Sequence, residues 1–162
     1  MSLRHLGTTH CFGLVDQEIY NALHHLLSPP HPHAGNAIVT NNCNTPIYLW
    51  SVGGSVDPRQ TIQPGVSYSE ALHYDPASGG VALKITKTPN GLFDGNPQLD
   101  FAYILDGSKT WYDLSLVFGD AFSGQRLKVQ PTYASCPSIC WPNGVNPGGH
   151  EVLTVCAQGC LV

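Results

Sequence analysis

The sequence predicts an all-β fold: an antiparallel β-sandwich, stabilised by disulfides, that follows an irregular or partly helical N-terminal segment. From Asn36 onward, apolar residues occur in short runs, and several runs alternate with polar residues as strands do. Between the runs lie turn-forming segments that hold many of the chain's 17 glycines and 13 prolines, and these residues interrupt helices. Five of the six cysteines fall in the same region, which is typical of a cross-linked extracellular domain.

Eight strands are expected, and this number of short strands with regular turns favours a sandwich. The run Pro46–Val52 is apolar on both faces, which predicts a strand inside the sandwich. Asp106 and Gly107 separate two apolar runs and predict a β-hairpin, because an Asp-Gly pair accepts the positive φ of a tight turn. The expected strands are Asn36–Thr40, Pro46–Val52, Val66–Leu72, Val81–Thr86, Leu99–Leu105, Thr110–Val117, Gln125–Gln130 and Val152–Cys156.

The composition limits the classes of function. The chain has 162 residues, which favours one folded domain, since domains cluster at about 100–150 residues. Its net charge is −4 and it has no cluster of basic residues, which argues against a nucleic-acid partner because such proteins need a positive surface. No apolar run reaches the ~18 residues of a membrane span. The glycine motifs that bind dinucleotides or phosphates are missing from the sequence, so we expect no cofactor.

Residues 1–35 are interpreted as a separate N-terminal segment, and residues 36–162 as the sandwich domain. The segment holds six of the eight histidines and ends in SPPHPHAG, which breaks regular structure, after a short helix expected at Leu14–Leu27. We interpret it as a linker, a processing region or an altered signal, because acidic residues and a histidine pair interrupt the apolar run that a signal peptide needs. Histidines such as His31 and His33 suit copper or zinc, but we interpret this tract as incidental and expect no metal site.

The cysteines allow two interpretations, a disulfide framework and a zinc site. Two pairs have the spacing Cys-x3-Cys, whereas zinc knuckles usually space their ligands as Cys-x2-Cys or Cys-x4-Cys. We therefore predict disulfides, and with them an oxidising compartment and a secreted protein. The odd number in the body leaves one cysteine over, as a thiol or as a partner for Cys11 or another chain, and the pairing stays open. The predicted disulfide residues are Cys43, Cys136, Cys140, Cys156 and Cys160.

Three segments carry a resemblance to a known family. The segment AIVTNNCNTPIYLWSVGG (Ala37 to Gly54) resembles the first strands of thaumatin-like proteins, and TWYDLSLVFGDAF (Thr110 to Phe122) resembles their YDVSLVDGF signature. The segment CPSICWPNGV resembles a short fungal branch, the Blastomyces yeast-phase-specific or antigenic thaumatin-like family. The resemblance covers residues 36–162 and implies a thaumatin-like β-sandwich, secreted and associated with the cell wall. It also implies that Cys43 pairs with Cys156 or Cys160.

The resemblance further implies an acidic cleft, through which some thaumatin-like proteins bind or slowly cleave β-1,3-glucan. Asp113 matches the first acid of the signature, whereas the second acid is replaced by Phe118 and the next carboxyl along the chain is Asp120. Ala102 stands at the expected glutamate position, and Asp100 shares its face on a strand. The catalytic candidates are therefore Asp113, Asp100 and Asp120, and the missing acids argue against hydrolysis, which generally needs two carboxyl groups.

Aromatic residues offer a second way to hold a sugar, because their flat faces stack on its C–H groups. Trp111 and Tyr112 lie on opposite faces of one expected strand, so one of them is expected to be exposed. Trp141 lies in a loop bounded by cysteine and proline, and we expect it either exposed or packed on a disulfide, whereas Trp50 is expected in the core. The predicted ligand-binding residues are Asp113, Asp120, Trp111, Tyr112 and Trp141.

Taken together, these features predict a monomeric, non-catalytic wall or host-interaction protein whose partner is β-glucan or another wall polysaccharide. Two alternatives stay open. One is a weak endo-β-1,3-glucanase, and the other is an effector or antigen that binds a host protein and has no affinity for sugar.

Overall fold

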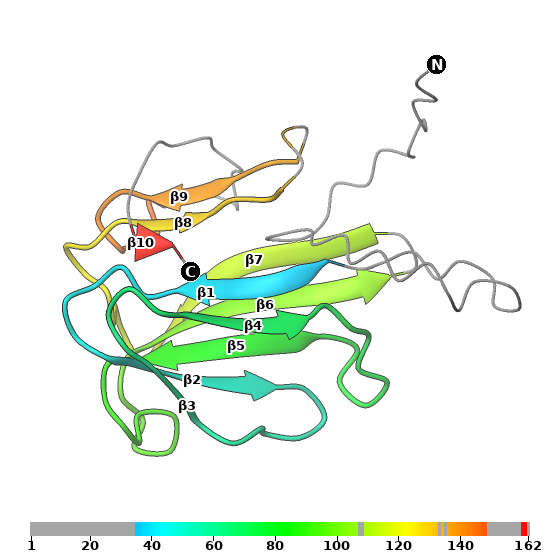
Figure 1. Cartoon of the computed structure of the whole chain (residues 1–162), viewed down its shortest axis with the longest axis horizontal. Helices are drawn as coiled ribbons and strands as arrows, with labels where there is room; N and C mark the ends of the chain where they lie inside the picture. Colours follow the sequence, from blue (N-terminus) through cyan, green and yellow to red (C-terminus); the bar gives the residue numbers. More distant parts are fainter. Residues whose placement is uncertain (1–34, 107–108, 133, 135, 149–159, 162) are drawn as a thin grey trace, which may run out of the picture.

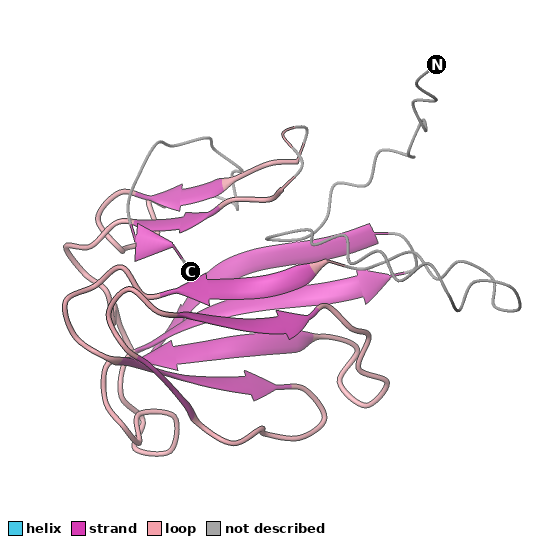
Figure 2. Ribbon diagram, viewed as in Figure 1, coloured by secondary structure: helices cyan, strands magenta, loops and turns pink. Residues whose placement is uncertain are grey.

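The computed structural model of the chain describes residues 35–106, 109–132, 134, 136–148 and 160–161. These residues form strands, turns and loops without a helix (Figures 1 and 2), which confirms the expected all-β class. Within this described part there is accordingly no helix that is long and apolar enough to cross a membrane. The expected helix at Leu14–Leu27, the strand at Val152–Cys156, and Cys11 and Cys156 lie outside the described residues.

A five-stranded antiparallel sheet forms one layer, in the order β3-β2-β5-β6-β7. The strands agree closely with the expected runs, and Asp106 pairs with Lys109 in the predicted hairpin between the last two. Strand β3 was not expected, because its sequence, QTI, has no apolar run. It forms by pairing with β2, for example through Ile62 opposite Ile47. The bounds are Gln60–Ile62 for β3, Ile47–Val52 for β2, Val81–Thr86 for β5, Gln98–Asp106 for β6 and Lys109–Val117 for β7.

Two smaller sheets form the opposite layer. Strand β1 (Asn36–Thr40) pairs antiparallel with β4 (Ser67–Ala71). Strand β8 (Leu127–Val129) pairs antiparallel with β9 (Ile139–Trp141) and parallel with β10 (Cys160–Leu161). Because β1 also contacts β10, the two small sheets follow one another across the five-stranded sheet (Figure 1). The last two strands were not expected, since the sequence around β9 has the composition of a cysteine-rich loop.

The core lies between the two layers, and alternation along the strands fills it. Cross-strand neighbours such as Leu83 and Phe101, and Phe101 and Leu114, turn their side chains inward and are almost fully buried. The opposite layer contributes Val39 of β1 and Leu127 of β8, both fully buried. Burial of each large apolar side chain contributes about 1.5–3 kcal/mol, so this interface is the main source of stability.

The turn after β1 is organised by one buried side chain, Asn41, which is 1% exposed. Its Nδ2 donates to the carbonyl oxygens of Thr45 and Ile62, both at 2.9 Å, and its Oδ1 accepts from the backbone N–H of Cys43 at 3.0 Å. Its backbone N–H donates to the carbonyl of Val66, and its backbone carbonyl accepts from the N–H of Gly65. One asparagine therefore joins the β1–β2 turn to the end of β3 and to the turn that follows it.

Replacing Asn41 with alanine is expected to lower the free energy of unfolding by about 3 kcal/mol or more, because three backbone groups lose their partner and each costs about 1–3 kcal/mol. Chemical denaturation of both proteins measures the difference. Asn42 is exposed, so Asn42→Ala is the matched control and should change the free energy by less than about 0.5 kcal/mol. Equal effects of the two substitutions would contradict the role of Asn41.

Candidate functional site

Two of the three predicted acids, Asp100 and Asp113, lie on the outer face of the five-stranded sheet, which is defined here as the face turned away from the core. Asp100 of β6 stands opposite Ser115 of β7, and Ala102 stands opposite Asp113. The register thus confirms that Asp100 and Ala102 share a face, and it adds Asp113 to that face. Diagonal neighbours of this kind are separated by roughly 7–8 Å. The structure therefore brings together two of the three predicted carboxyl groups.

The carboxyl of Asp100 is engaged by a lysine that the sequence analysis did not single out. Lys84 of β5 stands directly opposite Asp100, and its Nζ forms an ion pair with Asp100 Oδ2. Asp100 is only 5% exposed, and its Oδ1 has no hydrogen-bond partner among the described residues. This carboxylate is buried and paired with a lysine, which suits it to hold the sheet face together.

Changing Lys84 to methionine is expected to cost about 3–5 kcal/mol of unfolding free energy, because the buried Asp100 loses its counter-charge. The double variant Lys84→Met with Asp100→Leu should recover most of that loss, since both charges are then removed. Denaturation of the two single variants and the double variant gives the coupling between them. Additive effects, with no recovery in the double variant, would show that the ion pair has no such role.

Asp120 does not join the other two carboxyl groups. Asp113 lies four residues before the end of β7, or about 13 Å at the usual rise of a strand, and Asp120 follows two further residues with positive φ, Phe118 at 59° and Gly119 at 115°. Its side chain is exposed and its carbonyl accepts from the N–H of Ser123 at 3.2 Å. Asp120 therefore acts as a turn residue, and Phe118, at the position of the second family acid, is 68% exposed.

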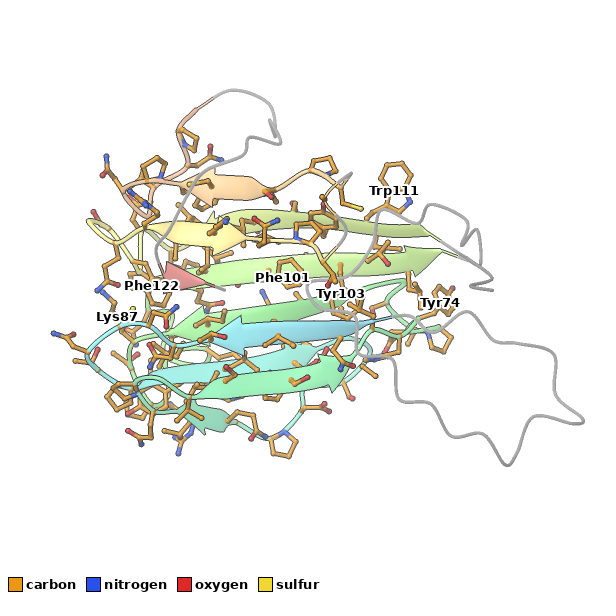
Figure 3. All side chains as sticks on the ribbon, turned by 45° about the horizontal axis from the view of Figure 1, so that its top comes forward. Tyr74, Lys87, Phe101, Tyr103, Trp111 and Phe122 are labelled. Carbon is orange, nitrogen blue, oxygen red and sulfur yellow. The ribbon has the colours of Figure 1, made fainter. Side chains whose placement is uncertain are left out.

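The aromatic candidates divide between the two faces of the sheet. Trp111 of β7 lies on the outer face and is 62% exposed, opposite the exposed Ile104. Figure 3 shows its ring projecting away from the layers, whereas Phe101 and Tyr103 point between them. Tyr112 has the opposite orientation: it packs against the core and its hydroxyl donates to the carbonyl of Pro137. One residue of this pair was expected to be exposed, and the structure shows that it is Trp111.

Of the two alternatives expected for Trp141, the exposed ring is wrong, because Trp141 is part of β9 and is 5% exposed within the core; packing on a disulfide stays a prediction. Trp50 is buried at 2% exposure as expected. It alternates with the core residue Leu49 on β2, however, and lies on the outer face, where the edge-on ring of Phe93 covers it at 6.1 Å between centroids.

The cysteines in the described part are buried, as expected of structural residues. Cys43, Cys136 and Cys140 are each less than a tenth exposed, and Cys43 Sγ lies 3.4 Å from Gln125 Oε1. The parallel pairing of β10 places the backbone of Cys160 beside Leu127, two residues from that glutamine. The disulfides themselves stay a prediction. No group of three metal-ligating side chains gathers among the described residues.

A second polar cluster, which the sequence analysis missed, lies between the two layers at one end of the sandwich. The carboxylate of Glu70 on β4 accepts from the hydroxyl of Tyr68 at 2.6 Å and from the hydroxyl of Tyr103 on β6 at 2.7 Å. His73 Nδ1 lies 3.2 Å from the same Tyr103 oxygen. Burial first, and then the hydrogen bond to Glu70, raise the pKa of both tyrosine hydroxyls well above their usual value of 10.0.

The cluster predicts a loss of stability in alkali. The folded state keeps the protons of Tyr68 and Tyr103 above pH 10.0, whereas the unfolded chain releases them, so this contribution is complete below pH 10.0 and is lost as the pH rises toward the folded values. Glu70→Gln should weaken the effect and move the titration of both hydroxyls part of the way back toward 10.0. Ultraviolet absorbance of tyrosinate, with denaturation below and above pH 10.0, measures both; a titration curve unchanged in the variant would rule out the carboxylate as a cause.

The packed layers of antiparallel strands form a β-sandwich of the thaumatin-like class. The family model described as Blastomyces yeast-phase-specific protein matches residues 25–160, and the chain belongs to this family.

Two curated relatives and one solved structure agree with that assignment. The antigenic thaumatin-like protein of Arthroderma benhamiae is 30% identical over 68% of this chain, which spans only 55% of that relative's length. The secreted thaumatin-like protein calA of Emericella nidulans is 32% identical over 72% of this chain and 68% of its own length. The crystal structure of the protein elicitor MoHrip2 from Magnaporthe oryzae superimposes with a TM-score of 0.56 at 25% identity, over 68% of this chain and 79% of that one.

Proposed function

We propose that this chain is a secreted, non-catalytic cell-wall or host-interaction protein that binds a β-glucan-like polysaccharide on the outer face of its five-stranded sheet. Secretion is supported by the name of the Emericella nidulans relative and by the buried cysteines of the sandwich. A compact domain with opposing sheets presents such a ligand with a rigid surface, since its strands keep the contacting side chains in place.

One observation carries the proposal: an exposed tryptophan and an aspartate lie next to each other on one face of an ordered strand. Trp111 and Asp113 are two residues apart on β7, so both side chains point to the outer face. Trp111 is 62% exposed, and an exposed indole is a suitable platform for the C–H face of a sugar ring. The carboxylate of Asp113 accepts hydrogen bonds from hydroxyl groups, which would orient that ring.

The same face argues for binding and not for hydrolysis. Glycoside hydrolysis generally needs a proton donor and an ionised carboxylate on the two sides of the bond. The carboxyl that lies diagonally across from Asp113 belongs to Asp100, which is buried and paired with Lys84. The residue opposite Asp113 is Ala102, which has no acid to contribute. A weak endo-β-1,3-glucanase is therefore the less favoured alternative.

Binding of a host protein is the second candidate function. Ile104 and Trp111 face each other across β6 and β7, and both are exposed, at 47% and 62%. Exposed apolar neighbours of this kind also occur at protein interfaces. Two similar proteins are named an antigenic thaumatin-like protein and a protein elicitor, and these names also support this candidate.

The proposal predicts that Trp111→Ala and Asp113→Ala each weaken retention on insoluble β-1,3-glucan by about tenfold, since loss of one stacking or hydrogen-bonding contact costs roughly 1–1.5 kcal/mol. The measurement is a depletion isotherm with the oxidised chain, with chitin and cellulose as comparison polymers. Tyr74→Ala removes an aromatic ring that is 58% exposed and lies on neither strand, so it should leave retention unchanged.

Three results would count against the proposal. Unchanged retention of both variants would remove the outer face from the site. No retention of the wild-type chain on any of the three polymers would favour the protein-binding candidate. Release of reducing ends from laminarin, lost in Asp113→Ala, would favour the glucanase.

A further inference from the structure

A pocket of about 280 Å³ opens on the outer face beside β2, near the edge of the sheet that β3 forms. It lies between the segment that precedes β3 and the segment that links β5 to β6. Residues from both segments, with Trp50 of β2, form its walls, and none of them belongs to the predicted acidic cleft. We call it the edge pocket; its lining includes Trp50, Asp57, Arg59, Pro89, Asn90 and Phe93.

The edge pocket is held in shape by contacts between its walls. Arg59 Nη1 donates to the carbonyl of Pro89 at 2.7 Å, which ties one segment to the other, and its guanidinium lies over the ring of Tyr48 at 5.5 Å. The side chain of Asn90 donates to Asp94 Oδ1 at 2.7 Å. The adjacent Gly91 packs so closely that a Cβ would meet the Oγ1 atoms of two threonines at 2.6 Å. A pocket formed before the ligand arrives costs less ordering on binding.

The lining combines an aromatic wall with a few polar groups. Phe93 is 66% exposed and meets Trp50 edge to face, with 87° between the two ring planes. Asp57 and Arg59 contribute charges of opposite sign, so the pocket favours a ligand without net charge. Small-molecule sites usually have this composition, at about 300–1,000 Å³. The edge pocket, at about 280 Å³, is slightly smaller than this range and fits one ring-sized group. A neutral pyranose ring has the matching chemistry: an apolar face for Phe93 and hydroxyl groups for the polar side chains.

We propose that the edge pocket binds one pyranose ring of a neutral β-linked glucan, as a second subsite for the polysaccharide. The identity of the sugar rests on the proposed function; the pocket and its chemistry do not. Strand β2 lies three strand spacings from β7 in the sheet, roughly 14 Å at the usual distance between strands. The register places Trp50 level with Ser115 of β7, and Trp111 lies four residues further along that strand, which adds about 13 Å in the strand direction. A glucan of several units therefore spans the edge pocket and the Trp111–Asp113 face, and the two weak contacts reinforce each other.

The test titrates the full isotope-labelled chain with laminaritetraose, a β-1,3-linked glucose tetramer, and follows amide and indole resonances by two-dimensional NMR. Saturating shifts are expected at Asn90, Phe93 and the indole of Trp50. Phe93→Ala should weaken binding about tenfold at these positions, as expected for loss of one stacking contact. Because Phe93 is largely exposed, the variant should fold, and Asp57→Asn provides a second variant that keeps the shape of the pocket.

Tyr74→Ala is the matched control, since Tyr74 lies at the opposite end of the sandwich from Lys87, where the segment leading to Phe93 begins (Figure 3). Shifts confined to residues 111–115 would overturn the edge pocket and leave the proposed function standing. Shifts confined to the edge pocket would support it and count against the Trp111–Asp113 face. No shift at either place, or equal effects of Phe93→Ala and Tyr74→Ala, would overturn the inference.

Discussion

The arrangement of the two layers depends on the hydrogen bonds of one buried amide. Asn41 uses both N–H groups and the oxygen of its side chain on the backbone of two turns that are distant in sequence. These bonds fix where β1 ends and how β2 begins, and the same residue bonds the turn that leads into β4. Since β1 and β4 pair with each other and pack on β2 and its neighbours, a shift in this turn would move one layer over the other. Hydrophobic burial stabilises the sandwich but is non-directional. The hydrogen bonds of Asn41 are directional, so they determine how the turns that connect the two layers are placed.

The outer face of the five-stranded sheet carries charged side chains on three neighbouring strands: Lys84 on β5, Asp100 on β6 and Asp113 on β7. The carboxylate of Asp100, the middle residue of the three, forms an ion pair with Lys84 and is shielded from water. The part of this face that solvent reaches has Trp111 and Asp113 of β7 at one side and the edge pocket beside β2 at the other. Both combine an aromatic surface with a hydrogen-bonding group, which suits reversible recognition of a neutral polymer more than bond cleavage.

Much of this organisation could be predicted from the sequence, because alternation along a strand is local. The runs at Asn36–Thr40 and Val81–Thr86 coincide with β1 and β5, and the shared face of Asp100 and Ala102 follows from the same period of two. The short strands β3 and β9 could not be predicted, since pairing with a neighbour and not their own pattern makes them strands. The burial of Trp141 depends on that pairing too.

Parts of the site depend on the pairing register of strands that are distant in sequence, so the sequence could not predict them. The partner of Asp100 is 16 residues away on β5, and only the alignment of β5 with β6 brings Lys84 opposite it. The edge pocket lies between two segments that connect strands. The polar cluster of Glu70, Tyr68 and Tyr103 connects the two layers, because Tyr103 of β6 donates to Glu70 of β4. Composition and spacing predict neither, because both arise from packing.

Strand β7 has a further consequence, since it is nine residues long and is the last strand of its sheet in the part of the chain that the structure describes. A long strand at the border of a sheet can pair with a second molecule through its unused backbone groups and so begin aggregation. Asp113 lies in the middle of this strand, between Trp111 and Leu114, and a charge at such a position makes strand addition costly. The carboxylate of Asp113, which we propose for ligand binding, would thus also oppose aggregation at high local concentration, so both roles constrain the same residue.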